Sequence, residues 1–168
     1  MAFDLGQYLQ IVHDRFQHDN FQLRQDTVAD VDVTVATMQE FKWSWMATKM
    51  HFFGIYGVSG EVTKADIERF SAEAFQFAHS NYTGIGRGLQ SGFGSLSALI
   101  TTNATQEAKN WVANFTKKHF ASFEVPVLVD LSTLELVYCR KKPLWGRIYY
   151  GRIHDFIERY YRPHLGAI

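Results

Sequence analysis

The chain has 168 residues, of which 46% are hydrophobic and 20% are charged. This composition excludes a disordered chain, because enough apolar side chains are present to form a core. The formal net charge is zero, which excludes a strong overall field that would attract nucleic acid or anionic lipid. The length is typical of one domain and the chain has no Pro- or Ser-rich linker, so the sequence predicts a single globular domain over residues 1–168.

The first half of the chain predicts a helix, three strands and a second helix. Apolar residues recur at helical spacing from Leu5 to Phe16, which indicates a helix over about 3–18. Residues 31–38 are rich in β-branched side chains and predict a strand, and the aromatic-rich stretch 40–58 predicts two more. Thr63 and Asp66 have the spacing of a capping box, so a second helix begins there, and Gly84 can end it.

The second half predicts alternating strands and helices. A buried strand is expected at 95–101, a helix around 108–115, a hairpin of strands 125–130 and 134–139, and a closing helix over about 149–160. The predicted order is therefore α-βββ-α-β-α-ββ-α. We expect an α/β (α+β) fold with a single mixed β-sheet flanked by helices.

Residues 84–94 contain five glycines in eleven positions. Such a density is typical of a segment whose backbone adopts positive φ, or to which another group must approach closely. The segment lacks the Gly-Lys-Ser/Thr of a P-loop, and it follows a helix, whereas the dinucleotide fingerprint follows a strand. Two interpretations remain open: a tight helix-to-strand connection, or a loop that binds an anion or a partner through Gly86, Arg87, Gly88 and Gln90.

The tripeptide Glu40-Phe41-Lys42 has the E-x-K pattern, and Asp30 and Asp32 precede it. Carboxylates and an ammonium group on neighbouring strands could hold a divalent cation for phosphodiester hydrolysis. Together with the element order and residues 100–109, this pattern is similar to Mrr-type members of the restriction-endonuclease-like fold. The resemblance implies a metal-dependent nuclease, active or inactive, although that family has its E-x-K shortly before a helix. A cross-strand salt bridge is the alternative explanation.

A broader resemblance covers most of the chain but implies no activity. Residues 87–92, 117–127 and 143–150 are similar to an uncharacterised bacterial and archaeal protein family. It supports the expected fold and leaves the function open.

Basic residues gather toward the carboxyl end of the chain. Residues 1–116 contain eight basic and twelve acidic residues, whereas residues 117–168 contain nine and five. The candidate binding residues there are Lys117, Lys118, Arg140, Lys141, Lys142 and Arg147. They favour an anionic ligand or a protein partner. Since no nucleic-acid-binding module is recognised, nucleic acid is not the expected partner.

Aromatic residues make up 15% of the chain, which predicts either a Phe-rich core or an aromatic surface for self-association. The opposed charges of the two ends also suit contacts between copies. Because no complete set of catalytic residues is found, we expect a non-catalytic binding or self-assembly protein, a homo-oligomer that contacts its partner around residues 84–94 and 140–147. A nuclease, or a sensor of a small anion or nucleotide, is the alternative.

The remaining expectations concern metals and location. The histidines have no metal-ligand spacing and Cys139 is the only cysteine, so neither a metal nor another cofactor is expected. The amino terminus lacks the features of a signal peptide and no apolar stretch is long enough to span a membrane. A cytoplasmic location without membrane contact is therefore predicted.

Overall fold

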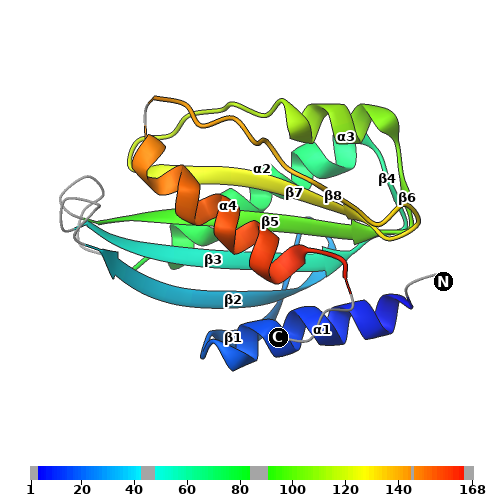
Figure 1. Cartoon of the computed structure of the whole chain (residues 1–168), viewed down its shortest axis with the longest axis horizontal. Coiled ribbons are helices and arrows are strands. Elements are labelled where there is room, and N and C mark those ends of the chain that lie inside the picture. The colour runs from blue at the N-terminus through cyan, green and yellow to red at the C-terminus, as the bar shows by residue number, and fades with distance from the viewer. Residues whose placement is uncertain (1–3, 43–47, 84–90, 145, 165–168) are drawn as a thin grey trace.

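The computed structural model describes residues 4–42, 48–83, 91–144 and 146–164. Its centre is a mixed six-stranded sheet with the order β1-β2-β3-β5-β7-β8 (Figure 1). The strands are β1 (Gln22–Val28), β2 (Val31–Lys42), β3 (Thr48–Val58), β5 (Ser91–Thr101), β7 (Ser122–Asp130) and β8 (Glu135–Val137). Short strands β4 (Glu61–Val62) and β6 (Asn103–Ala104) form a separate pair, and the helices are α1 (Leu5–His18), α2 (Lys64–Asn81), α3 (Gln106–Ala113) and α4 (Arg147–Tyr161).

The predicted fold class and element order are confirmed. β3, β5 and β7 are parallel neighbours, joined by crossovers through α2 and α3, while β1–β2, β2–β3 and β7–β8 are antiparallel. Both crossovers advance across the sheet in the same direction. The described sheet therefore has no reversal of winding between its parallel strands, and it lacks the crevice in which doubly wound folds bind nucleotides.

Helices α1 and α4 cover one face of the sheet over a core rich in aromatic rings. Phe16 stacks on Tyr160 with ring centroids 4.3 Å apart and on Tyr56 at 5.6 Å. Gly54 of β3 makes room for this packing, since a Cβ there would lie 2.9 Å from Phe16 Cζ. Among the described residues, Phe120 is the one aromatic side chain that is largely exposed. Most of the aromatic residues that the structure describes thus fill the core, and self-association through an aromatic surface is not supported.

Helices α2 and α3 cover the other face over a mainly aliphatic core. Ala74 and Ala78 of α2 are fully buried with Leu99 of β5 and Val112 of α3. The predicted capping box is confirmed: the Thr63 hydroxyl accepts a hydrogen bond from the Asp66 amide, and the Asp66 carboxylate accepts one from the Thr63 amide.

Several predicted boundaries are wrong. Strand β1 was missed because four of its seven residues from Gln22 to Val28 are exposed in succession, as suits a sheet edge, and show no apolar alternation. The two strands expected within 40–58 are the end of β2 and the whole of β3. Strand β5 begins at Ser91 rather than Ser95, so Gly92 and Gly94 are strand residues. At Gly92 a Cβ would lie 2.6 Å from the Ala121 carbonyl oxygen, so this glycine serves a close approach within the chain.

Candidate functional site

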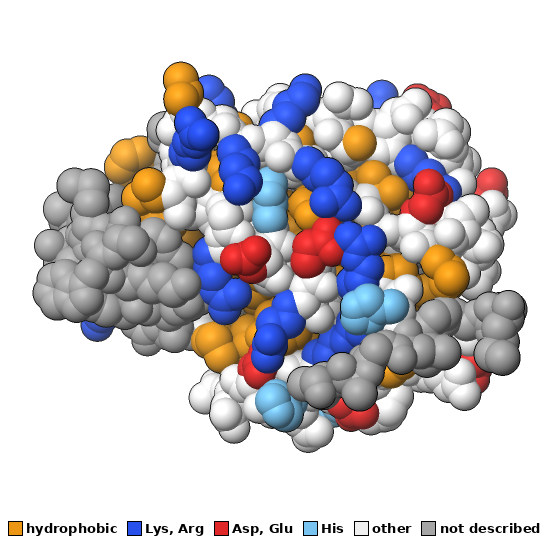
Figure 2. Space-filling view, viewed as in Figure 1, with side chains coloured by type: hydrophobic (Ala, Val, Ile, Leu, Met, Phe, Trp, Pro, Cys, Tyr) orange, Lys and Arg blue, Asp and Glu red, His pale blue; other side chains and the backbone are white. Residues whose placement is uncertain are grey.

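A basic surface extends over α4 and the segment that precedes it (Figure 2). Residues 138–164 contain seven basic and two acidic residues, which leaves ten basic and fifteen acidic residues in the rest of the chain. We call this surface the basic face, and its seven residues are Arg140, Lys141, Lys142, Arg147, Arg152, Arg159 and Arg162. Sequence reasoning found the first four and missed Arg152 and Arg159 of α4 and Arg162 at its C-cap, whose spacing places them together.

Part of the basic face is held by ion pairs. Arg140 and Arg162 both contact the Glu158 carboxylate, which also accepts a hydrogen bond from the Tyr138 hydroxyl at 2.7 Å. Burial opposes ionisation of Glu158, yet the hydrogen bonds from Arg162 and Tyr138 outweigh it and lower its pKa. Arg159 donates two hydrogen bonds to Asp19 of the α1 C-terminus, at 2.6 and 2.9 Å. These ion pairs hold the side chains of Arg140, Arg159 and Arg162 in place.

The outer part of the basic face combines charge with apolar surface. Lys141, Lys142 and Arg147 are exposed, and none of them forms an ion pair with another described residue. Leu144 is 88% exposed and Ile148 is 51% exposed in the same stretch of chain. Gly146 lies against Phe123, so this stretch is at the end of the sheet where β7 begins.

The opposite end of the sheet is acidic. There β2 begins and β3, β5 and β7 end, as the strand registers require. Its exposed carboxylates are Asp30, Asp32, Glu61, Asp66, Glu107 and Glu135. Three basic residues at this end, Lys64, Arg69 and Lys109, pair with some of these carboxylates. The molecule is therefore polarised along its strands, and we call this region the acidic end.

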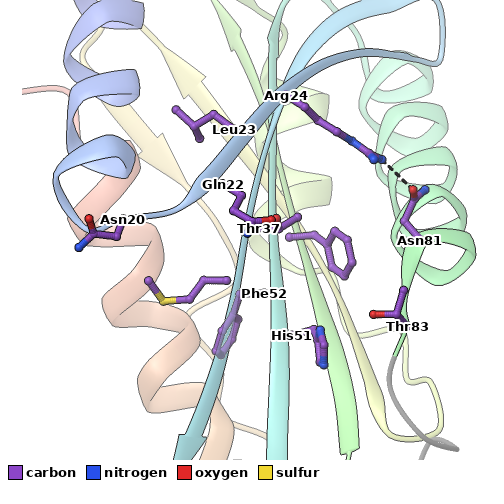
Figure 3. Close-up of a pocket in the computed structure, with 11 residues that line it drawn as sticks. Asn20, Gln22, Leu23, Arg24, Thr37, His51, Phe52, Asn81 and Thr83 are labelled. Carbon is purple, nitrogen blue, oxygen red and sulfur yellow. Dashed lines mark hydrogen bonds between the residues drawn. The ribbon is translucent and has the colours of Figure 1, made fainter.

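A cleft lies at the β1 edge of the sheet, where β1 begins and α2 ends (Figure 3). Its volume is about 570 Å³. The side chains that face α2 come from three strands and from the end of α2, and they are Gln22, Arg24, Thr37, His51, Phe53, Asn81 and Thr83. Asn20, Leu23, Met38 and Phe52 line the half that faces α1. Sequence reasoning missed this cleft, because its residues are scattered over sixty positions.

The described part of the cleft carries little free charge. Arg24 donates a hydrogen bond to the Asn81 side-chain oxygen at 2.7 Å, lies 3.8 Å from Asp26, and stacks 5.2 Å from the centre of the Phe77 ring. Burial and the nearby Lys49 lower the pKa of His51, which keeps its imidazole neutral near pH 7. The cleft thus offers amides, hydroxyls and a neutral imidazole.

Lys117 and Lys118 do not join the basic face. They lie beyond the end of α3, which stops at Ala113. Lys117 is 3.5 Å from Glu124 of β7, a carboxylate that also accepts hydrogen bonds from Ser71 at 3.0 Å and pairs with His119 at 2.7 Å. Because Ser71 belongs to α2, this cluster faces α2, whereas Arg140 contacts α4 through Glu158.

The residues predicted for a nuclease do not converge. Asp30 lies in the turn before β2 and pairs with Arg69, while Asp32 and Glu40 lie on β2 itself, eight residues apart. At about 3.3 Å per residue, about 26 Å of strand separates them, so one cation cannot bind both. The side chains of Glu40 and Lys42 lie outside the described part of the structure. The expected arrangement on two neighbouring strands is therefore wrong.

The other predicted binding residues, Gly86, Arg87, Gly88 and Gln90, also lie outside the described residues. Within those that the structure describes, no three His, Cys, Asp or Glu side chains are grouped so that they could hold a metal ion. None of the helices described here has both the length and the hydropathy needed to cross a bilayer. Comparisons with known protein families, with curated proteins and with solved structures find no match.

Proposed function

We propose that the protein is a non-catalytic assembly protein that binds an acidic protein surface through its basic face, and that this surface is the acidic end of a second copy. The observation that carries the proposal is the separation of charge: seven basic residues against two acidic ones in residues 138–164, with an excess of five acidic residues elsewhere. Such contacts are head-to-tail, because two different surfaces of the same chain meet.

The apolar residues of the basic face favour a protein as the partner. Phosphate groups of nucleic acid are bound by charged and polar side chains and make no use of exposed aliphatic residues. Protein interfaces combine an apolar centre with a polar rim, which fits Leu144 and Ile148 beside Lys141, Lys142 and Arg147. The ion pairs of Arg159 and Arg162 also hold those side chains in place before contact, which lowers the entropy cost of binding.

Sedimentation velocity tests this proposal at about 50 mM and about 500 mM NaCl, since salt screens contacts between exposed charges. We expect oligomers at low salt that dissociate at high salt. Replacing Lys141, Lys142 and Arg147 with Glu is expected to give a monomer at both salt concentrations, whereas Lys64→Glu at the acidic end serves as the control and keeps the oligomer. A monomeric wild-type protein at low salt, or a triple variant that still assembles, would contradict the proposal.

Leu144→Asp separates the apolar contribution from the charge. It leaves the net basic character of the face in place, so an interface held by charge alone would survive it. We expect Leu144→Asp to weaken assembly at least about tenfold, because it places a carboxylate at the centre of the contact.

A further inference from the structure

We propose that the half of the cleft that faces α2 binds a neutral saccharide. The site is separate from the basic face, because its side chains lie on the α2 side of the sheet whereas the basic face lies over α4. It consists of Gln22 and Thr37, which are partners in the β1–β2 register, His51 of β3, and Asn81 and Thr83 at the end of α2. The whole cleft, of which this half is a part, has a volume of about 570 Å³, within the usual range of small-molecule sites.

The polar side chains of the cleft match the hydroxyl groups of a sugar. A hydroxyl group donates one hydrogen bond and accepts others, and the side chains that suit it present both kinds of atom close together. The amide of Gln22 has a donor and an acceptor end, and the hydroxyls of Thr37 and Thr83 can do either. His51 contributes one donor and one acceptor nitrogen while it is neutral.

The shape of the cleft is set by rigid elements. Phe53 is 4% exposed and lies between Thr37 and His51 on the same face of the sheet, where it forms an apolar floor. His51 packs edge-on against the Tyr82 ring, with centroids 5.1 Å apart. Asn81 is held at the end of α2 by a hydrogen bond from its amide to the Phe77 carbonyl at 2.8 Å. Groups held in this way lose little freedom when a ligand binds.

The charges around the cleft favour a neutral ligand over an anion. Arg24 is the cation that lines it in the described structure, and its guanidinium already contacts Asn81 and Asp26. Lys49, whose charge lowers the pKa of His51, is exposed and does not line the cleft. A carboxylate or phosphate would have to compete with these contacts and with the Asp26 charge. Ligand hydroxyls can instead add to the Arg24–Asn81 pair without displacing it.

NMR titration of the full ¹⁵N-labelled chain with cellobiose tests the proposal, carried to about ten times a dissociation constant of about 1 mM. We expect saturable shifts of the side-chain amide signals of Gln22 and Asn81 and of the backbone signals of Thr37 and His51. Thr37→Val removes one hydroxyl at nearly constant volume and should raise the dissociation constant at least about fivefold, since one hydrogen bond contributes about this factor.

Thr34→Val is the matched control. It removes a hydroxyl from the same strand three residues away, on the opposite face, where Thr34 contacts Gln25. The dissociation constant of the Thr34→Val variant for cellobiose should stay within about twofold of the wild-type value. Absence of saturable shifts with cellobiose, or equal weakening by both variants, would overturn the proposal. So would tighter binding of glucuronate or glucose 6-phosphate, because these would identify an anion site.

Discussion

The two faces of the sheet place polar groups in different ways. On the α4 side, charge lies on the surface: arginines outnumber the two carboxylates of α4, and the core beneath them is rich in packed rings. On the α2 side, the core is mainly aliphatic, and polar groups line a cleft or surround the buried Glu124. A charged surface suits a large partner of opposite charge, whereas a cleft with little free charge suits a small neutral ligand. One fold thus offers two distinct binding surfaces.

Charged residues are buried on both faces, Arg15 on the α4 side and Glu124 and Asp130 on the α2 side, and they are stabilised differently. Arg15 of α1 is 6% exposed and donates hydrogen bonds to the carbonyl oxygens of Tyr160 and Arg162 at 3.2 and 2.8 Å. It therefore caps the carboxyl end of α4, where the helix dipole is negative. Glu124 on the other face is paired with His119 and Ser71. The buried charge of Arg15 is thus stabilised by the end of a helix, and that of Glu124 by an ion pair and a hydrogen bond.

The largest effect is expected for Arg15→Met. The substitution removes every donor that Arg15 supplies to the end of α4 and leaves the buried Tyr160 carbonyl unsatisfied, which should cost about 3 kcal/mol in the free energy of unfolding. Urea denaturation followed by circular dichroism measures it. Arg69→Met on α2 is the control, because that side chain is exposed, and its denaturation midpoint should match the wild type. A midpoint for Arg15→Met equal to that of the control would refute the capping role.

A smaller effect separates the two cores. Phe16→Leu keeps an apolar side chain but loses ring contacts with Tyr56, Tyr160 and their neighbours, whereas Phe70 of the α2 side has no ring contact with a described residue. Since an aromatic pair contributes about 1 kcal/mol beyond its buried area, Phe16→Leu should destabilise the protein by about 1–2 kcal/mol more than Phe70→Leu does. Equal losses in the same denaturation experiment would show that ring stacking does not distinguish the two faces.

The smallest effect concerns acid stability. Hydrogen bonds from Arg159 and Tyr160 hold the pKa of Asp19 well below its usual range. A carboxyl group whose pKa is lower in the folded state stabilises the protein above its unfolded pKa of about 4, and this stability is lost as the pH falls. Asp19→Asn should cost about 1 kcal/mol at pH 7, and this cost should decrease progressively as the pH falls below about 4. A loss that is independent of pH would contradict the role of the charge.

The sequence predicted the fold more completely than the binding surfaces. Apolar spacing and the Thr63 capping box are local signals, and they were sufficient for the helices. Strand β1 was not predicted because an exposed edge strand needs no apolar alternation. The glycines at 92 and 94 were interpreted as loop residues, although Gly92 is required by the close approach of the Ala121 carbonyl across the sheet. That contact joins residues 29 positions apart in the sequence.

The candidate surfaces also differ in whether they depend on residues close in sequence or on how distant segments pack. Lys141, Lys142 and Arg147 could be predicted because they are close in sequence. Arg152 and Arg159 join them because α4 presents one face to solvent, and this depends on how the helix packs on the sheet. The cleft depends on strand register, which brings Gln22 opposite Thr37 and Thr37 opposite Phe53. Register is determined by the whole sheet and cannot be read from any one segment.

Charge-swap complementation tests the head-to-tail assembly most directly. One variant replaces Lys141, Lys142 and Arg147 with Glu, and the second replaces Asp32, Glu61 and Glu107 of the acidic end with Lys. The two surfaces of each variant then carry like charge. Sedimentation velocity at low salt should therefore show that each variant alone is a monomer. Mixed in equal amounts, they should assemble, because each altered end meets its complement on the other chain. Variants that assemble alone, or a mixture that stays monomeric, would contradict the account.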